Sequence, residues 1–372
     1  MSPKYSFEYE VRMRDDVADK YAKKYPEKVQ MAYEGMLEAR DLSRDALEKG
    51  IDIFSDPRNN PGKVEALRRA PGLKEWFPYT KTDLALYFLY YPLESQLVPG
   101  IPLPKDLEGW QCLPIGIGLR ERANMVHNVT LERSKEYHER NKEKKFVQFV
   151  VASGNGRHAL CTLKEARDKE HNNHVLLLDN NPDALSHAQK YASDMELTEH
   201  CEIVEGDIFS FDGVLMKDDT TNELVKMPED LLVPQIVDIG ATGCYAYEDD
   251  WMQEGEISTF GEPQSVKRPG QITLMKQLWE HVEPGGSYLR DSANLVNPHK
   301  PEEGKSPLLE YLDWSITWNG LIPATIHGNH GVEGEFGILP MIEKANLPGL
   351  YKVVIHITPS GVFNGYELFK KA

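Results

Sequence analysis

The 372-residue sequence predicts an α/β fold, in which a mostly parallel sheet ends in a C-terminal antiparallel β-hairpin and follows a mainly helical N-terminal cap. From Lys145 onward, apolar runs alternate with helix-like segments, as strands and helices do in a parallel sheet. The last segment, KVVIHITPSGVFNGYELFKK, places two strand-like runs around the Pro-Ser-Gly turn at 359–361, which predicts a hairpin. We therefore divide the chain into a helical extension, 1–140, and an α/β domain, 141–372.

The N-terminal extension shows helical periodicity. Apolar residues recur at three- or four-residue steps, or multiples of them, between Val29 and Leu47, and would stripe one side of a helix that ends at Gly50. Residues 64–77 suggest a second, shorter helix, and about 119–141 another. These segments are the basis for expecting a mostly helical cap.

The α/β domain begins with the run FVQFVVAS at Phe146, which predicts a strand, followed by a helix over 157–169. The nearly continuous apolar run HVLLLDN, from His174, predicts a strand buried on both faces. Asn181 and Pro182 predict the N-cap and first residue of the next helix. Three further strands are predicted in CEIVEGD, VPQIVDIG and GGSYLRDSAN.

Composition and charge narrow the function classes. With 59 acidic and 42 basic residues, the chain has a net charge of −17, so we expect no nucleic-acid partner. The sequence contains no apolar run of about 18 residues, so we expect no membrane span. Its N-terminus is polar, so we expect no signal peptide. The four cysteines are far apart in the sequence, so we expect reduced thiols in a cytoplasmic protein and no metal site.

Three predicted strand ends carry groups that suit a nucleotide-like ligand. Gly154-Asn155-Gly156 follows the first strand, where glycines let a ligand approach the backbone. Asp179 ends the second strand, where a carboxylate can accept hydrogen bonds from ribose hydroxyls. Asp207 ends the third, a position that suits an adenine amine. In an open parallel sheet, such strand ends meet at one edge, where ligands bind.

Residues 145–372 resemble the class I S-adenosyl-L-methionine (SAM)-dependent methyltransferases, which have a Rossmann-like fold. ASGNGR resembles the first motif of that family, DNNP the second and EGDIF the third. The resemblance implies a transferase with SAM as cofactor. Its glycine turn would line the methionine part, Asp179 would hold the ribose, and Asp207 and Ile208 would flank the adenine. The implied cofactor-binding residues are Ser153, Gly154, Asn155, Gly156, Asp179, Asn180, Gly206, Asp207, Ile208, Asp238 and Gly240.

The first motif departs from the family pattern in two places. The family usually has an acidic residue just before the first glycine, near the SAM amino group, where this chain has Ala152 and Ser153. The usual third glycine is also replaced, since Arg157 and His158 follow the turn. We therefore expect the aminobutyrate end of SAM to be held differently, by Asn155 or by an aromatic or acidic residue of the cap.

A second segment, IVDIGATGCY from Ile236, looks like a first motif by eye. No second strand ending in an acidic residue follows at the right distance, so we interpret it as the fourth strand and its loop. Asp238 and Gly240 would then face the reacting end of the cofactor. Asp238 is our candidate catalytic base, with Tyr245 behind it.

The favoured function is SAM-dependent methyl transfer to a small-molecule acceptor enclosed by the cap. One alternative keeps SAM and changes the chemistry, so that the SAM amine attacks its own butyrate chain to give methylthioadenosine and a small ring such as azetidine-2-carboxylate. Another is an NAD(P)-dependent oxidoreductase, which would share the glycine turn and Asp179. The full dinucleotide fingerprint is absent, because Ala159 stands at its last glycine, although alanine is sometimes allowed there. A SAM-binding module without activity is a further alternative, and the sequence leaves the oligomeric state open.

Overall fold

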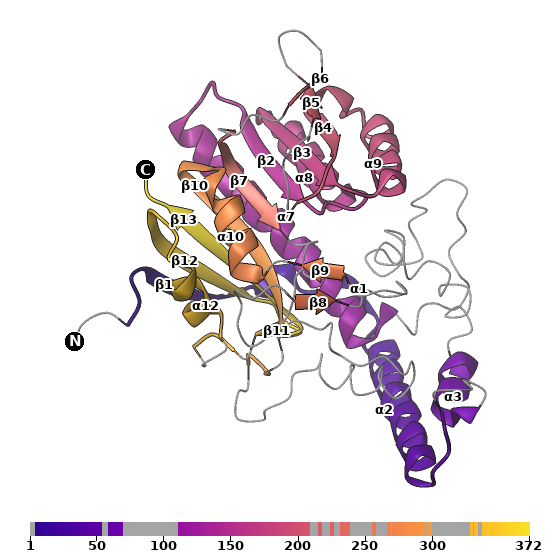
Figure 1. Ribbon diagram of the computed structural model, residues 1–372. Coiled ribbons are helices and arrows are strands. Elements are labelled where there is room, and N and C mark those ends of the chain that lie inside the picture. Colours follow the sequence, from indigo (N-terminus) through magenta and orange to yellow (C-terminus); the bar gives the residue numbers. More distant parts are fainter. Residues whose placement is uncertain are drawn as a thin grey trace.

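A nine-stranded sheet with helices on both faces forms the body of the protein (Figure 1). The computed structural model describes residues 4–53, 59–69, 111–208, 215–217, 224–226, 231–238, 255–257, 266–268, 270–294, 296–299, 328–329, 331–333 and 337–372. Within these ranges, no helix combines the length and the apolar character that crossing a membrane requires.

The helices and strands follow the predicted alternation. Before residue 145 they are β1 (Glu8–Met13), η1 (Asp15–Val17), α1 (Lys20–Lys24), α2 (Pro26–Glu48), α3 (Pro61–Arg69) and α7 (Pro114–Arg140). After it they are β2 (Phe146–Val151), α8 (Arg157–Asp168), β3 (Asn173–Asp179), α9 (Pro182–Asp194), η4 (Thr198–His200), β4 (Cys201–Glu205), β5 (Leu215–Lys217), β6 (Leu224–Lys226), β7 (Val233–Asp238), β8 (Gly255–Ile257), β9 (Val266–Arg268), α10 (Gln271–Glu280), β10 (Val282–Asn294), β11 (Gly328–Asn329), α12 (Ile338–Ala345), β12 (Leu350–Ile357) and β13 (Phe363–Lys370). The predicted α/β strands and the closing hairpin are confirmed.

The sheet order is β1-β12-β13-β10-β7-β2-β3-β4, and β11 pairs with β10. Neighbours are parallel except where β13 lies antiparallel between β10 and β12. The chain runs outward from β2 through β3 to β4 and then crosses back to β7 on the other side of β2. This reversal places the switch point of the sheet, where open α/β folds bind ligands, at the carboxyl ends of β2 and β7.

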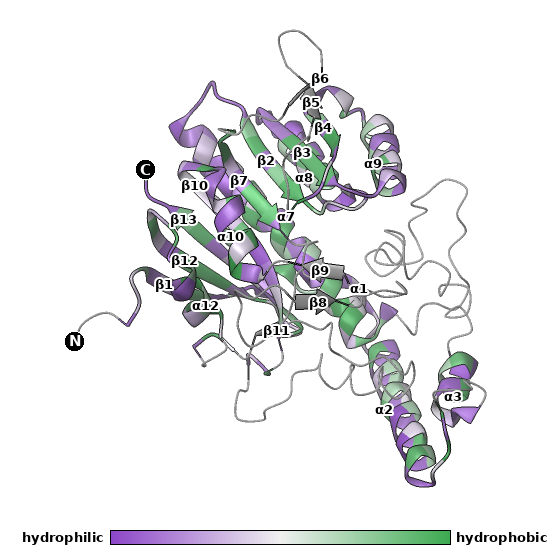
Figure 2. Ribbon diagram, in the orientation of Figure 1, coloured by the Kyte–Doolittle hydropathy of each residue, from purple (hydrophilic) through white to green (hydrophobic). Residues whose placement is uncertain are grey.

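The two faces of the sheet are covered by different helices. Val150 of β2 and Leu289 of β10 belong to one apolar cluster with residues of α7, α8 and α9. Their chain neighbours, Phe149 and Tyr288, belong to a second cluster with α10 and α12. Because both faces are covered, the central strands are almost continuously hydrophobic (Figure 2). Full burial of each large apolar side chain stabilises the fold by about 1.5–3 kcal/mol.

Among the described residues before 141, β1 and α7 pack directly on this α/β body. The strand β1 pairs in parallel with β12, from Glu8 beside Lys352 to Met13 beside Ile357, and so extends the sheet. The long helix α7 packs on β2, β7, β13 and α8. The sequence analysis predicted only helices in this region, so the strand β1 is an additional element. The domain boundary at residue 140 stays a prediction.

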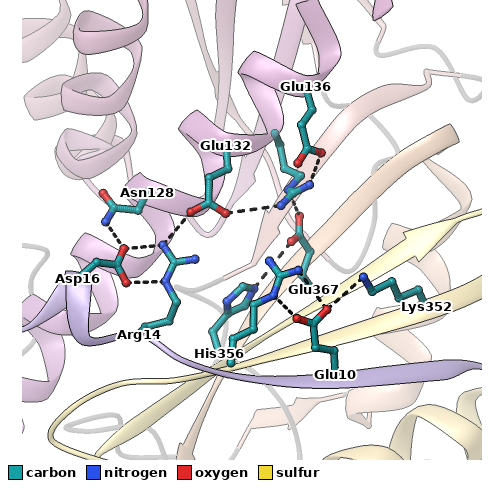
Figure 3. A network of polar contacts seen from close by, with 11 residues as sticks. Glu10, Arg14, Asp16, Asn128, Glu132, Glu136, Lys352, His356 and Glu367 are labelled. Carbon is teal, nitrogen blue, oxygen red and sulfur yellow. Dashed lines mark hydrogen bonds and ion pairs between the residues drawn. The ribbon is translucent and has the colours of Figure 1, made fainter. Parts of the chain in front are cut away.

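A polar network joins β1 to α7 and to the closing hairpin (Figure 3). Arg14, only 5% exposed, donates to Asp16 Oδ2 at 2.8 Å and to Glu132 Oε1 of α7 at 2.9 Å. Lys352 of β12 lies 3.2 Å from Glu10 Oε2. These contacts attach the edge strand through both its backbone and its side chains.

The helices α2 and α3 pack against each other and project away from the sheet (Figure 1). Their close approach depends on Gly62, where an added Cβ would lie 2.0 Å from the carbonyl oxygen of Ala39. The helix α2 ends at Glu48, and Gly50, the predicted terminating glycine, has a positive φ of 74° just beyond it. The helix α3 begins at Pro61 rather than residue 64. Residues 70–77 of the second predicted helix lie outside the described residues.

Candidate functional site

The glycine turn after β2 contains two glycines with different structural roles. Gly154 and Gly156 both have left-handed backbone conformations, with φ of +55° and +61°. At Gly156, the residue before α8, an added Cβ would lie 2.3 Å from Leu177 Cδ1 of β3, so this glycine allows helix and strand to pack closely. At Gly154, no heavy atom of the described residues lies within 4 Å of the Cβ position. The backbone there faces open space that a ligand can occupy.

Asp179 connects this turn to the next strand. Its Oδ2 accepts a hydrogen bond from the Gly154 N–H at 2.7 Å, and its Oδ1 accepts from the Asn181 N–H at 2.9 Å. Asn181 in turn caps α9, as predicted, by accepting from the N–H groups of Asp183 and Ala184. Because each carboxylate oxygen has a second acceptor site, Asp179 can still accept hydrogen bonds from a ligand hydroxyl.

The end of β4 lies beside Asp179. The Gly206 N–H donates to the Asp179 carbonyl oxygen at 3.0 Å, and the Asp207 side chain is exposed. Ile208 is 6% exposed and packs in the apolar cluster on the α10 face. The fold therefore brings Asp207 to the same sheet edge as the glycine turn and commits the Ile208 side chain to the core.

The remaining predicted cofactor residues differ in accessibility. Ser153 is buried, Asn155 is half-buried and Asn180 is exposed. Asn155 Oδ1 accepts from the Arg157 N–H at 3.3 Å, which orients its amide within the turn. Gly240 lies outside the described residues.

Asp238, the candidate base, ends β7 and is fully buried. The Tyr288 hydroxyl donates to its Oδ2 at 2.6 Å, and Arg290 Nε lies 3.6 Å from the same oxygen. Burial, followed by the nearby charge of Asp238, raises the pKa of Tyr288 well above its usual value, so the phenol keeps its proton. The tyrosine and arginine therefore hold the Asp238 side chain in place. Its role as a base stays a prediction, and Tyr245 lies outside the described residues.

A second charged cluster, on the opposite face of β10, was missed by the sequence analysis. Arg122 of α7 donates from Nη1 to Asp291 Oδ2 at 2.7 Å, and both residues are at most 4% exposed. Burial raises the pKa of Asp291 to about 6, although Arg122 opposes this shift. The sequence did contain a signal for this cluster, namely the adjacent charged residues Arg290 and Asp291 in an otherwise buried strand. Buried strands rarely carry charged residues without a partner.

His158, the second residue of α8, belongs near this cluster. Burial, reinforced by the charge of Arg122, lowers the pKa of His158 to about 4, so its ring is neutral near pH 7. In the described part of the chain, no group of three or more His, Cys, Asp or Glu side chains is placed to hold a metal ion. The expectation of no metal site stays a prediction, since residues 239–254 are not described.

Comparisons with known proteins support the fold. No family model matches the sequence, and the curated proteins gave no match. The structure is similar to that of a possible exported protein from Bordetella parapertussis, at 14% identity and a TM-score of 0.50, over 92% of this chain and 97% of that chain. At this identity the match shows the fold alone.

Two methyltransferase structures are more distant matches. The SAM-dependent methyltransferase SibL matches at 15% identity and a TM-score of 0.41, over 84% of this chain and 74% of that chain. A SAM-dependent methyltransferase from Geobacter sulfurreducens, solved with S-adenosyl-L-homocysteine, matches at 15% identity and a TM-score of 0.26, over 44% of this chain and 48% of that chain. Both superpose too weakly to bear on the activity of this chain.

Proposed function

We propose that the protein binds SAM at the carboxyl edge of its sheet and transfers the methyl group to a small-molecule acceptor. The observation that carries this proposal is the 2.7 Å hydrogen bond from the Gly154 N–H to Asp179. It joins the open glycine turn to the carboxylate of the neighbouring strand, beside the switch point where open α/β sheets bind nucleotides.

The residues present fit the cofactor from the adenine to the sulfur. The exposed Asp207 at the end of β4 suits the adenine amine, and Asp179 at the end of β3 has acceptor capacity left for ribose hydroxyls. The open backbone at Gly154 leaves room for the chain that continues from the ribose. These groups follow the sheet from β4 to β2 in the order of the parts of SAM.

Methyl transfer from SAM does not require the protein to form a covalent intermediate. When bound, SAM supplies an already activated methyl group on its sulfonium. The chain has to align the acceptor and exclude water. The buried group of Asp238, Tyr288 and Arg290 provides fixed charges and dipoles at the end of β7 and at the neighbouring positions of β10. Where the acceptor must lose a proton, Asp238 is the proposed base, and full turnover by Asp238→Asn would contradict that role.

The first test is to incubate the purified protein with SAM alone and follow the nucleosides by mass spectrometry. We expect SAM to remain intact until a protein-free extract of small molecules is added, and then to be converted into S-adenosylhomocysteine. Enzyme-dependent methylthioadenosine from SAM alone would contradict methyl transfer and favour the intramolecular cyclisation. Stabilisation by NAD or NADP, with none by SAM, would instead favour an oxidoreductase.

The cofactor site itself is tested by Asp179→Asn. The carboxylate of Asp179 should contribute charge-assisted hydrogen bonds, so we expect S-adenosylhomocysteine affinity to fall about tenfold to a hundredfold. Asp183→Asn is the matched control, because Asp183 is an exposed carboxylate at the start of the neighbouring helix. Equal affinities for the two variants, measured by calorimetry, would place the ribose elsewhere.

A further inference from the structure

Asp291 of β10 has an oxygen that the fold leaves available. The side chain is 1% exposed, and its Oδ2 accepts from Arg122 Nη1 at 2.7 Å. Its Oδ1 has no hydrogen-bond partner among the described residues. A buried carboxylate oxygen without a hydrogen bond is costly, so its retention suggests a partner that arrives with a ligand.

The sheet register places Asp291 at the edge that carries the glycine turn. Val150 pairs with Val237, and Val237 pairs with Leu289, so these three residues form one row across β2, β7 and β10. Asp291 is two residues beyond Leu289 on β10, and Ala152 is two residues beyond Val150 on β2. The two positions are therefore level with each other, and the two-strand separation between their backbones is about 10 Å. Leu289 and Asp291 point to the same face, which α7 and α8 cover and from which the glycine turn continues into α8.

The order of groups along this edge indicates which part of SAM comes near Asp291. The proposed adenine, ribose and methionine contacts follow β4, β3 and β2. A ligand that continues in this direction brings its aminobutyrate end towards β7 and β10. Asp238 of β7 is less suited to receive it, because it points to the opposite face and is held by Tyr288. The chain also has no acidic residue just before Gly154, since Ala152 and Ser153 stand there.

We propose that Asp291 binds the ammonium group of the SAM aminobutyrate chain through its Oδ1 and replaces the missing acidic residue of the glycine turn. This inference rests on the proposed function and adds a residue to that site. A carboxylate is the appropriate partner for an ammonium group, because a charge-assisted hydrogen bond offsets the cost of removing both charges from water. Arg122, on the other oxygen, fixes the orientation of the carboxylate.

The surrounding charges make this contact sensitive to pH. Arg122 from α7 faces Asp291, while Arg290 and Asp238 act on it electrostatically from the opposite face of the sheet. The neighbouring strand β13 places Gly365 beside it. His158 of α8, near Arg122, is neutral above about pH 4 because its pKa is lowered. Burial raises the pKa of Asp291 to about 6. Since only the ionised carboxylate attracts the ammonium group, binding should weaken as the pH falls below about 6.

The test compares two ligands that differ only in the aminobutyrate chain. S-adenosylhomocysteine has the ammonium group, and 5′-methylthioadenosine has the same adenosine and a thioether but lacks it. For Asp291→Asn, measured by calorimetry at pH 7, we expect S-adenosylhomocysteine affinity to fall about tenfold to a hundredfold. The affinity for methylthioadenosine should remain within about twofold. Glu367→Gln is the control, because Glu367 is another fully buried carboxylate, whose partners Arg133 and His356 belong to the network of Figure 3.

A second measurement uses the unaltered protein, in case the variant fails to fold. Between pH 7 and pH 5, the ratio of the two affinities should shift against S-adenosylhomocysteine, and a constant ratio would overturn the proposal. Equal losses for both ligands in Asp291→Asn, or no loss for either, would also overturn it. If the unaltered protein bound neither ligand, the proposed function itself would fail, which is a distinct outcome.

Discussion

The two glycines of the turn show how single residues divide structural and functional roles. Both have positive φ, but only Gly156 lacks room for a side chain, because Leu177 lies against it. The nearby Ala152 also has a positive φ, of 48°, which is strained for a residue with a Cβ. Backbone strain of this kind concentrates where a ligand has to be approached closely.

This difference predicts unequal effects of two matched substitutions. Gly154→Ala should lower the free energy of unfolding by about 1 kcal/mol, since the left-handed conformation is its only cost. Gly156→Ala adds a clash with Leu177 and should cost about 2–4 kcal/mol. Urea denaturation of both variants checks this. Equal losses of unfolding free energy would mean that the packing at Gly156 relaxes easily. In either case, the free-energy loss of Gly154→Ala should be larger for nucleoside binding than for unfolding.

Among the elements, β1 depends most on contacts distant in sequence. Its backbone pairs with β12, and Arg14, which follows it, donates its backbone N–H to the Ile357 carbonyl oxygen at 3.0 Å. The Arg14 guanidinium then reaches Asp16 and Glu132 from a buried position (Figure 3). The ion pairs of Arg14 should therefore stabilise this strand more than exposed pairs do.

We predict that Arg14→Met lowers the free energy of unfolding by about 1–3 kcal/mol, because it removes a buried guanidinium together with its ion pairs to Asp16 and Glu132. The control is Lys4→Met, which removes an exposed ion pair with Glu333 and should cost less than about 1 kcal/mol. Hydrogen exchange should show faster exchange of the β1 amides in Arg14→Met alone. Similar losses in both variants would contradict a specific role for Arg14.

For the whole molecule, two buried groups give opposite contributions to the pH dependence of stability. Burial is the main reason that the pKa of His158 is lowered from 6.5 to about 4. The contribution of His158 to the free energy of unfolding is therefore present above pH 6.5 and is lost as the pH falls through 4. Burial is also the main reason that the pKa of Asp291 is raised from 3.8 to about 6. The contribution of Asp291 is therefore present below pH 3.8 and is lost as the pH rises through 6. Between pH 4 and pH 7, the two effects oppose each other.

We therefore predict opposite changes in the pH dependence of the free energy of unfolding for His158→Gln and Asp291→Asn. Relative to the unaltered protein, the histidine variant should gain stability on acidification from pH 7 to pH 4, and the aspartate variant should lose it. Each change should be about 3 kcal/mol at most over this range. Denaturant titrations at several pH values test this, and parallel curves for all three proteins would show that neither group titrates as described.

The sequence by itself determined the strands, helices and turn of the α/β body. Alternating apolar runs, the N-cap at Asn181 and the glycine turn are local signals, because each depends on residues that are neighbours in the chain. They also placed Asp179 and the turn at one sheet edge, since the carboxyl ends of parallel strands meet there.

Only the tertiary structure decided the place of β1, the core position of Ile208 and the pairing of Arg122 with Asp291. The alternation of charged and apolar residues in EYEVRM is compatible with a strand, but nothing in the sequence names its partner. Arg122 and Asp291 are 169 residues apart, and their contact exists because α7 lies under the face to which that position of β10 points. Such contacts follow from strand order and register, which the chain sets only when the whole sheet has formed.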